Sequence, residues 1–255
     1  MCTLVILRRP GHHWPLLIAA NRDEMRQRTA SPPARHWPDR PEVIAGIDHE
    51  AGGSWLGVND HGVLAAVMNR EGSLGQAEGK RSRGELVLEA LDHAEAKEAA
   101  GALSDLHPNA YRPFNLIIAD PNDAYWLRHG GDGEIRVHPI PAGLHMLSST
   151  EIDDPAHPRI AAYLPRFQAA PTPDPDLGTW SAWQQLVADR GVGADNLRTA
   201  AMNLDLPDGF GTLCSSLVAL PAHPGFDAHP VWLHADGPPD TAAFEAILPG
   251  SPRTA

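Results

Sequence analysis

Met1-Cys2-Thr3-Leu4-Val5-Ile6-Leu7 opens the chain and decides how the rest of it folds. Leu4 to Leu7 is an unbroken apolar run, which is typical of a strand buried on both faces. A second apolar run from Leu16 to Ala20 follows a Pro-Gly turn, so the chain is predicted to begin with a β-hairpin. In a hairpin the end of the second strand returns beside the start of the first. We therefore expect Asn21 to Asp23 to lie close to Cys2.

Cys2 is a candidate nucleophile because a small residue after the initiator methionine allows that methionine to be removed. Its α-amine, with an ordinary pKa of roughly 7.7–8.0, can then accept a proton from a thiol of pKa about 8.5. One residue would supply both nucleophile and base, and a rigid strand would hold it in place. The alternative is that Cys2 is a small buried residue near the chain end.

Composition predicts a globular protein and excludes several classes of partner. The chain has 255 residues, of which 42% are hydrophobic and 20% charged, and we expect a single domain over residues 1–255. A net charge of −12 argues against nucleic acid or an anionic membrane as the main partner. No apolar stretch approaches the roughly 20 residues of a membrane span. Cys2 and Cys214 are too few for a disulfide framework, so we expect a cytoplasmic location.

The predicted elements alternate between groups of strands and pairs of helices. Strands joined by hairpins favour antiparallel sheets with the helices outside them, so we expect an α+β fold, a four-layer α/β/β/α sandwich of two stacked sheets. Residues 25–42 and the last residues of the chain are predicted to be loops. Further strands are expected at Val43–Gly46, 54–59, Val63–Met68, Phe114–Ala119, Ala124–Arg128, Glu134–Pro139, Gly143–Ser149, Gly211–Leu220 and Pro230–His234, and helices at Ser82–His93, Glu95–Leu106, Arg159–Ala170 and Thr179–Asp189.

Four motifs in order along the chain resemble those of the NRDE family. They are Met1-Cys2, Ala20-Asn21-Arg22-Asp23-Glu24, Gly53-Ser54-Trp55-Leu56-Gly57-Val58-Asn59 and Asn69-Arg70-Glu71-Gly72. The family includes the transport and Golgi organisation type proteins of eukaryotes and their bacterial relatives, and the resemblance runs from Cys2 to about Phe244. In fold the family is similar to the N-terminal nucleophile (Ntn) hydrolases, among them the cysteine amidases that cleave bile salts or penicillin V.

The resemblance to the amidases implies roles for five residues. Cys2 matches the nucleophile, and Asp23 falls on the aspartate that holds the α-amine. Asn69 falls on the asparagine whose side-chain amide binds the oxyanion. Asn21 and Arg22 complete the motif around Asp23. The amidases' arginine falls on Ala20 in this chain, and Arg22 is the candidate to replace it.

Four further residues are expected to contact a substrate: Trp55, Asn59, Arg70 and Ser149. Ser149 stands where the amidases carry an asparagine, and Cys214 stands where a Gly-Thr-Arg pattern has arginine. These two departures, together with Ala20, bear on whether an amide is hydrolysed.

Two functions from different classes remain open at this point. The first is a hydrolase that cleaves a C–N amide bond of an unidentified small molecule through an acyl-thioester and needs no cofactor. The second comes from the eukaryotic relatives, which are associated with haem and lipid homeostasis, and implies a haem-binding or haem-trafficking protein that uses the same pocket without turnover. For haem the candidate iron ligands are Cys2, His12, His13, His61 and His145. No set of residues has the spacing of a zinc site.

Overall fold

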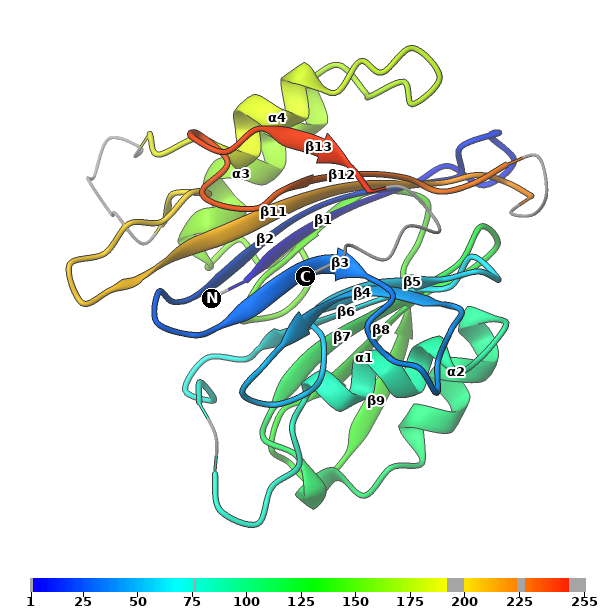
Figure 1. Ribbon diagram of the computed structural model, residues 1–255, viewed down its shortest axis with the longest axis vertical. Coiled ribbons are helices and arrows are strands. Elements are labelled where there is room, and N and C mark those ends of the chain that lie inside the picture. The colour runs from blue at the N-terminus through cyan, green and yellow to red at the C-terminus, as the bar shows by residue number, and fades with distance from the viewer. Residues whose placement is uncertain (1, 76, 192–199, 224–227, 248–255) are drawn as a thin grey trace.

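The computed structural model describes residues 2–75, 77–191, 200–223 and 228–247. Two antiparallel sheets stack on each other, and a pair of helices covers the outer face of each (Figure 1). The first sheet has six strands in the order β10-β1-β2-β11-β12-β13, and the second has seven in the order β3-β4-β5-β6-β7-β8-β9. The predicted α/β/β/α sandwich is confirmed.

The strands of the six-stranded sheet are β1 (Thr3–Arg8), β2 (Leu16–Met25), β10 (Gly143–Leu147), β11 (Phe210–Leu220), β12 (Val231–Ala235) and β13 (Phe244–Ala246). Those of the seven-stranded sheet are β3 (Ala30–Ala34), β4 (Val43–Asp48), β5 (Leu56–Asn59), β6 (Leu64–Asn69), β7 (Phe114–Ala119), β8 (Ala124–His129) and β9 (Ile135–Pro139). The helices are α1 (Gly84–Leu91), α2 (Ala96–Ser104), the short 3-10 helix η1 (Pro108–Ala110), α3 (Pro158–Ala169) and α4 (Ser181–Val187).

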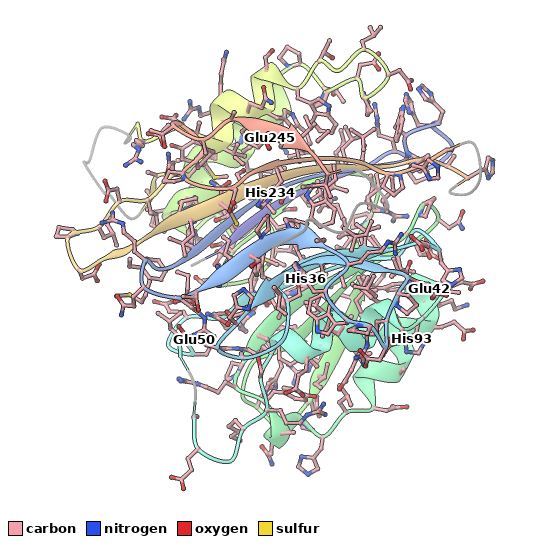
Figure 2. All side chains as sticks on the ribbon, viewed as in Figure 1. His36, Glu42, Glu50, His93, His234 and Glu245 are labelled. Carbon is pink, nitrogen blue, oxygen red and sulfur yellow. The ribbon has the colours of Figure 1, made fainter. Side chains whose placement is uncertain are left out.

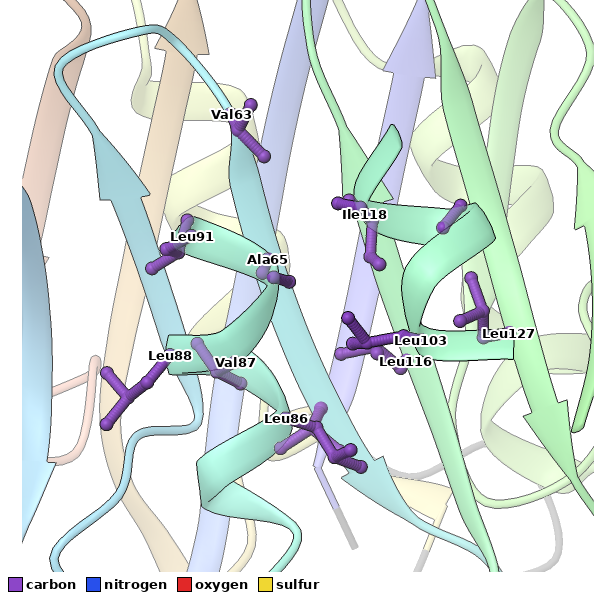
Figure 3. Close-up of a cluster of buried hydrophobic side chains, with 14 of the residues drawn as sticks. Val63, Ala65, Leu86, Val87, Leu88, Leu91, Leu103, Leu116, Ile118 and Leu127 are labelled. Carbon is purple, nitrogen blue, oxygen red and sulfur yellow. The ribbon is translucent and has the colours of Figure 1, made fainter. Parts of the chain in front are cut away.

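Three buried apolar layers hold these elements together. Leu4 and Ile6 of β1 point into the layer between the two sheets, while Val5 points into the layer under α3 and α4. This alternation is the reason that the run from Leu4 to Leu7 is apolar at every position, because successive side chains of a strand face opposite sides of its sheet. The third layer lies between the seven-stranded sheet and the helices α1 and α2, where Leu86 and Leu116 are among the packed side chains (Figure 3). Trp180 and Trp183 are buried under the other helix pair.

Three boundaries differ from the sequence-based expectations. β2 continues to Met25, so Asn21 to Asp23 lie within a strand; all three pair with β11, and Asn21 also pairs with β1. The expected loop at 25–42 contains the edge strand β3, whose Pro32 and Pro33 sit at an irregularity in its pairing with β4. Proline is tolerated there because an edge strand has one side without ladder hydrogen bonds. β13 adds a short edge strand where loose chain was expected.

Within the described ranges, the helices are all too short and too polar to cross a lipid bilayer.

Candidate active site

Cys2 lies immediately before β1, between the ends of the neighbouring strands. Its Sγ donates a hydrogen bond to the backbone carbonyl of Asp23 over 3.7 Å. Its own carbonyl accepts a hydrogen bond of 3.0 Å from Ser148 Oγ at the end of β10. The β1–β2 register, with Thr3 opposite Asn21, brings Cys2 beside the Asn-Arg-Asp segment, as the hairpin predicts.

The Asp23 carboxylate is fixed by a buried network. Its Oδ2 is 2.9 Å from Arg159 Nη1, and neither side chain of this ion pair has exposed surface. Its Oδ1 accepts a hydrogen bond of 2.7 Å from the hydroxyl of Thr212 on β11. Arg159 also donates to the hydroxyl of Thr3, next to Cys2. The carboxylate is therefore held by groups from β11 and α3, and the guanidinium that holds it is itself bonded to β1.

Arg22 points to the opposite face of β2 and serves a different part of the site. Its guanidinium lies 4.1 Å from the centre of the Trp55 ring, and its Nη2 is 3.0 Å from Asp48 Oδ2. Arg22 therefore contacts Trp55 and Asp48, whereas Arg159 forms the ion pair with Asp23.

A cavity of about 310 Å³ brings the principal candidates together. Cys2, Arg22, Asp23, Trp55 and Asn69 all line it. Asn69 is the last residue of β6, and within the described part of the chain its side-chain amide makes no hydrogen bond. An amide with this freedom can donate to a group that enters the cavity.

Asn21 and Asn59 have structural partners instead of facing this cavity. The amide of Asn21 donates to the carbonyls of Val187 and Met202, on the helix side of the first sheet. Asn59 donates to the carbonyls of Leu91 and His93 and accepts from two backbone N–H groups of its own turn. Neither lines the cavity of about 310 Å³, although Asn21 lines a much smaller one of about 20 Å³ that also touches Cys2.

Arg70 and Ser149 likewise connect structural segments. Arg70 donates to Asn115, to the Thr150 carbonyl and to Glu151. The hydroxyl of Ser149 lies 3.4 Å from His157 Nε2, while its carbonyl accepts from the Glu71 N–H. These contacts tie the segment after Asn69 to the segment after β10.

Burial controls the acidity of both thiols. Burial raises the pKa of the Cys2 thiol above its ordinary value. Burial also raises the pKa of Cys214 to about 12, so this second thiol stays protonated at neutral pH. A protonated Cys2 needs a base to become a nucleophile. Met1 lies outside the described residues, and its removal, which would supply that base, stays a prediction.

The histidines proposed for haem lie away from Cys2. His12 and His13 are in the β1–β2 turn, and His61 is in the β5–β6 turn. His145 Nδ1 is 2.6 Å from Asp153 Oδ2. The histidines labelled in Figure 2, His36, His93 and His234, are likewise outside the cavity lining. Among the described residues, no group of three or more His, Cys, Asp or Glu side chains is arranged to hold a metal ion.

Comparison with known proteins decides the family. A sequence model of the family described as Transport and Golgi organisation 2 matches residues 1–184. The chain belongs to this family.

Curated members are similar to this chain. The Transport and Golgi organization 2 homolog of Mus musculus is 31% identical over 153 residues, covering 55% of this chain and 52% of the mouse protein. The Homo sapiens homolog is 34% identical over 148 residues, covering 55% and 52%, and the Bos taurus homolog 38% over 116 residues, covering 41% and 38%. The chain thus spans about half the length, or less, of these relatives.

Solved structures of other proteins share the fold of this chain. The chain is similar to a Caenorhabditis elegans N-acylethanolamine-hydrolyzing acid amidase ortholog, with a TM-score of 0.58 and 12% identity over 97% of this chain and 100% of that one. It is also similar to a variant of the conjugated bile acid hydrolase from Clostridium perfringens, with a TM-score of 0.50 and 13% identity over 96% of both chains. The fold is therefore that of the Ntn hydrolases.

Arg159 and Thr212 are site residues that sequence reasoning missed. Thr212 belongs to the Gly-Thr pattern at the start of β11, which was recognised without a role for its hydroxyl. Arg159 carries no comparable signal, because it lies 136 residues from Asp23 at the start of a helix. The packing of α3 against the first sheet is what brings it there.

Proposed function

We propose that this chain is an N-terminal cysteine hydrolase that cleaves a C–N amide bond of a small molecule. The observation that carries the proposal is that Cys2, the Asp23 carboxylate held by Arg159, and Asn69 line one cavity. Nucleophile, positioning carboxylate and oxyanion donor are the three parts that acyl transfer to a terminal cysteine needs. The Ntn-hydrolase fold supports the same reading.

In the proposed mechanism, removal of Met1 leaves Cys2 with a free α-amine. The amine takes the proton of its own thiol, and Sγ attacks the acyl carbon of the substrate. The side-chain amide of Asn69 and a backbone N–H stabilise the resulting oxyanion, and the ammonium, held by Asp23, returns its proton to the leaving nitrogen. The C–N bond breaks and an acyl-thioester remains on Cys2. Water then attacks the thioester, with the amine as base, and releases a carboxylic acid and the free thiol.

Arg159 and Thr212 act through Asp23 in this mechanism. A carboxylate that is already held by a guanidinium and a hydroxyl cannot rotate away from the amine, so the ammonium and the thiol keep one relative orientation. The thiol to which this applies is protonated at rest because burial raises its pKa. The α-amine is therefore essential to the proposal and not an accessory.

Haem handling in the same pocket is the second function considered, and the geometry supports it less. Cys2 lines the cavity, but His12, His13, His61 and His145 do not, so a cysteine–histidine ligand pair does not form there. The names of the family relatives refer only to transport and Golgi organisation. Haem binding stays a prediction, as does a cytoplasmic location.

The test is a search for the acyl-enzyme. The mature protein is mixed with a panel of acyl p-nitroanilides of increasing chain length, quenched with acid and analysed by intact mass. We expect a mass increase equal to the acyl group on Cys2, a burst of p-nitroaniline, and loss of both in Cys2→Ala. Cys214→Ala is the matched control and keeps the burst. Turnover that persists in Cys2→Ala, or no adduct with any amide or with a more reactive thioester, would overturn the proposal.

A further inference from the structure

The cavity beside Cys2 carries more positive than negative charge, although the whole chain has a net charge of −12. Three acidic side chains line it: Asp23, Glu24 and Asp48. Six basic side chains do so: Arg22, Arg28, Lys80, Arg81, Arg83 and Arg112. The local excess of cations runs against the charge of the molecule and therefore requires its own explanation.

The acidic residues of the lining are already used on one side of the cavity. Asp48 binds Arg22 at 3.0 Å and Arg28 at 2.6 Å, and Asp23 binds Arg159. On the opposite side Arg81 is paired with Glu85 and Glu89 of α1, outside the cavity lining. The excess positive charge is therefore concentrated at Lys80 and Arg83, for which the described residues supply no acidic partner, with Arg112 beside them.

Arg83 is the central member of this group. Its guanidinium donates to the carbonyls of Ser73, Pro113 and Gly75 and to the Ser73 hydroxyl, which are all neutral oxygens. Arg112 donates to the same Gly75 carbonyl at 3.4 Å and to the carbonyls of Gly72 and Leu74. Two guanidinium groups thus converge on one backbone oxygen at the wall of the cavity.

The pKa of the Arg83 guanidinium reflects the electrostatic cost of burying it beside a second cation. Burial, and next the charge of Arg112, lower the pKa of the Arg83 guanidinium to about 10. A bound anion would lower the free energy of both cations, because a guanidinium forms charge-assisted hydrogen bonds with carboxylates and phosphates.

We propose that the substrate carries an anionic group, a carboxylate or a phosphate, that binds to Arg83 and Lys80 while its amide carbonyl lies at Cys2. The inference deepens the proposed function and rests on it for the position of the amide. The cavity's volume of about 310 Å³ is that of a site for a small molecule. The shape of the site does not distinguish a carboxylate from a phosphate, so the experiment uses both.

The test measures binding of matched probes that differ only in charge. Butanoate and butyl phosphate are the anionic probes, and butanamide is the neutral one, each titrated calorimetrically into the mature protein. We expect the anions to bind and butanamide to bind at least about tenfold more weakly, a difference of about 1.4 kcal/mol. Binding of the anions should weaken as salt is raised, because charges at the open wall are screened. The tighter of the two anions identifies the chemical source of the charge.

Variants test which side chains are responsible. Arg83→Gln should lose about tenfold in affinity for the anions and leave butanamide unchanged. Lys80 is exposed, so Lys80→Gln folds normally and should show a smaller loss of the same kind. Lys97→Gln, on the outside of α2, removes the same charge away from the cavity and should bind as the wild type does.

Arg83 also makes hydrogen bonds that hold the surrounding backbone, so Arg83→Gln could change the fold as well as the charge. A second measurement therefore uses only the wild type and Lys80→Gln. The rate at which Cys2 is alkylated by iodoacetate, divided by the rate with neutral iodoacetamide, should be higher in the wild type than in Lys80→Gln and should fall with salt. Equal binding of butanoate, butyl phosphate and butanamide, or an alkylation ratio that Lys80→Gln leaves unchanged, would overturn the inference. Anion binding without any acyl-enzyme would overturn the proposed function alone, and hydrolysis of neutral amides without anion binding would overturn only the inference.

Discussion

Asp23 and Arg159 form a fully buried ion pair that joins strand β2 to helix α3. Asp23 Oδ2 and Arg159 Nη1 are 2.9 Å apart. The resemblance to the amidases places their arginine at Ala20 in this chain, and here the guanidinium that reaches Asp23 comes from helix α3. The departure at Ala20 therefore does not leave Asp23 without a cation. The site is assembled by tertiary packing and not by the local motif alone.

Arg159→Met is predicted to destabilise the protein strongly. Removing one member of a buried ion pair leaves the other as an uncompensated charge, which costs about 3–5 kcal/mol. For a chain of this size we expect the melting temperature to fall by roughly 6–20 °C. The control is Arg136→Met, which breaks an exposed pair with Asp132 and should shift the midpoint by less than about 4 °C. Similar midpoints for the two variants would show that the Asp23–Arg159 pair contributes little.

Asn69→Ala is predicted to slow acyl transfer without affecting the nucleophile. Loss of one oxyanion donor lowers kcat by about 10²–10³-fold in acyl-transfer enzymes. Because Asn69 makes no side-chain hydrogen bond among the described residues, the melting temperature and the rate of Cys2 alkylation should both stay near the wild-type values. A variant that keeps full kcat would remove Asn69 from the mechanism.

His145 and Asp153 are predicted to make stability depend on pH. The hydrogen bond that the His145 ring donates to the Asp153 carboxylate is the main cause that raises the pKa of His145 in the folded protein. A raised folded pKa means that protonation favours the folded state, so this contribution is complete below the unfolded pKa of about 6.5 and is lost as pH rises through the folded value. The melting temperature should fall over that window in the wild type.

Asp153→Asn is the matched variant for this pH effect. Asp153 has a φ of 55°, a left-handed conformation that asparagine also adopts readily, so the backbone is preserved while the charge is lost. The decrease in melting temperature above pH 6.5 should become smaller in the variant. An unchanged pH profile would contradict the assigned role of the pair.

Gly53→Ala is predicted to distort the wall of the cavity. An added Cβ at Gly53 would lie 2.4 Å from the backbone carbonyl carbon of Gly84, at the start of α1. Backbone cannot yield as a side-chain end can, so the start of α1 must shift and Arg83 with it. We expect lower stability, together with weaker binding of butanoate. Gly101→Ala, on α2 with no atom within 4 Å of its added Cβ, is the control that should be neutral or stabilising.

The sequence predicts the layers well because its patterns are local. Leu4 to Leu7 of β1 and Leu116 to Ala119 of β7 are unbroken apolar runs, and Trp180 and Trp183 follow helical spacing. Edge strand β3 was missed because Pro32 and Pro33 resemble loop residues, and only pairing with β4 makes that segment a strand.

The site shows the same division between local and tertiary information. The hairpin places Cys2 beside Asp23, and the family motif predicts Asn69. By contrast, Arg159 reaches Asp23 only through the packing of α3. The amides of Asn21 and Asn59 are bound to carbonyls from separate segments, and no local pattern indicates this. Residues of one motif can therefore face opposite sides of the same strand.

The intact mass of the purified protein before and after a short iodoacetamide pulse tests the central claim most directly. We predict that Met1 is absent and that one carbamidomethyl group is added at Cys2, with none in Cys2→Ala. Cys214 should stay unlabelled because burial raises its pKa to about 12. Protein prepared with Met1 retained should label slowly at neutral pH, because burial raises the pKa of the Cys2 thiol and no adjacent amine assists. A mature protein that keeps Met1, or one in which Cys2 stays unlabelled while it is folded, would contradict an N-terminal cysteine nucleophile.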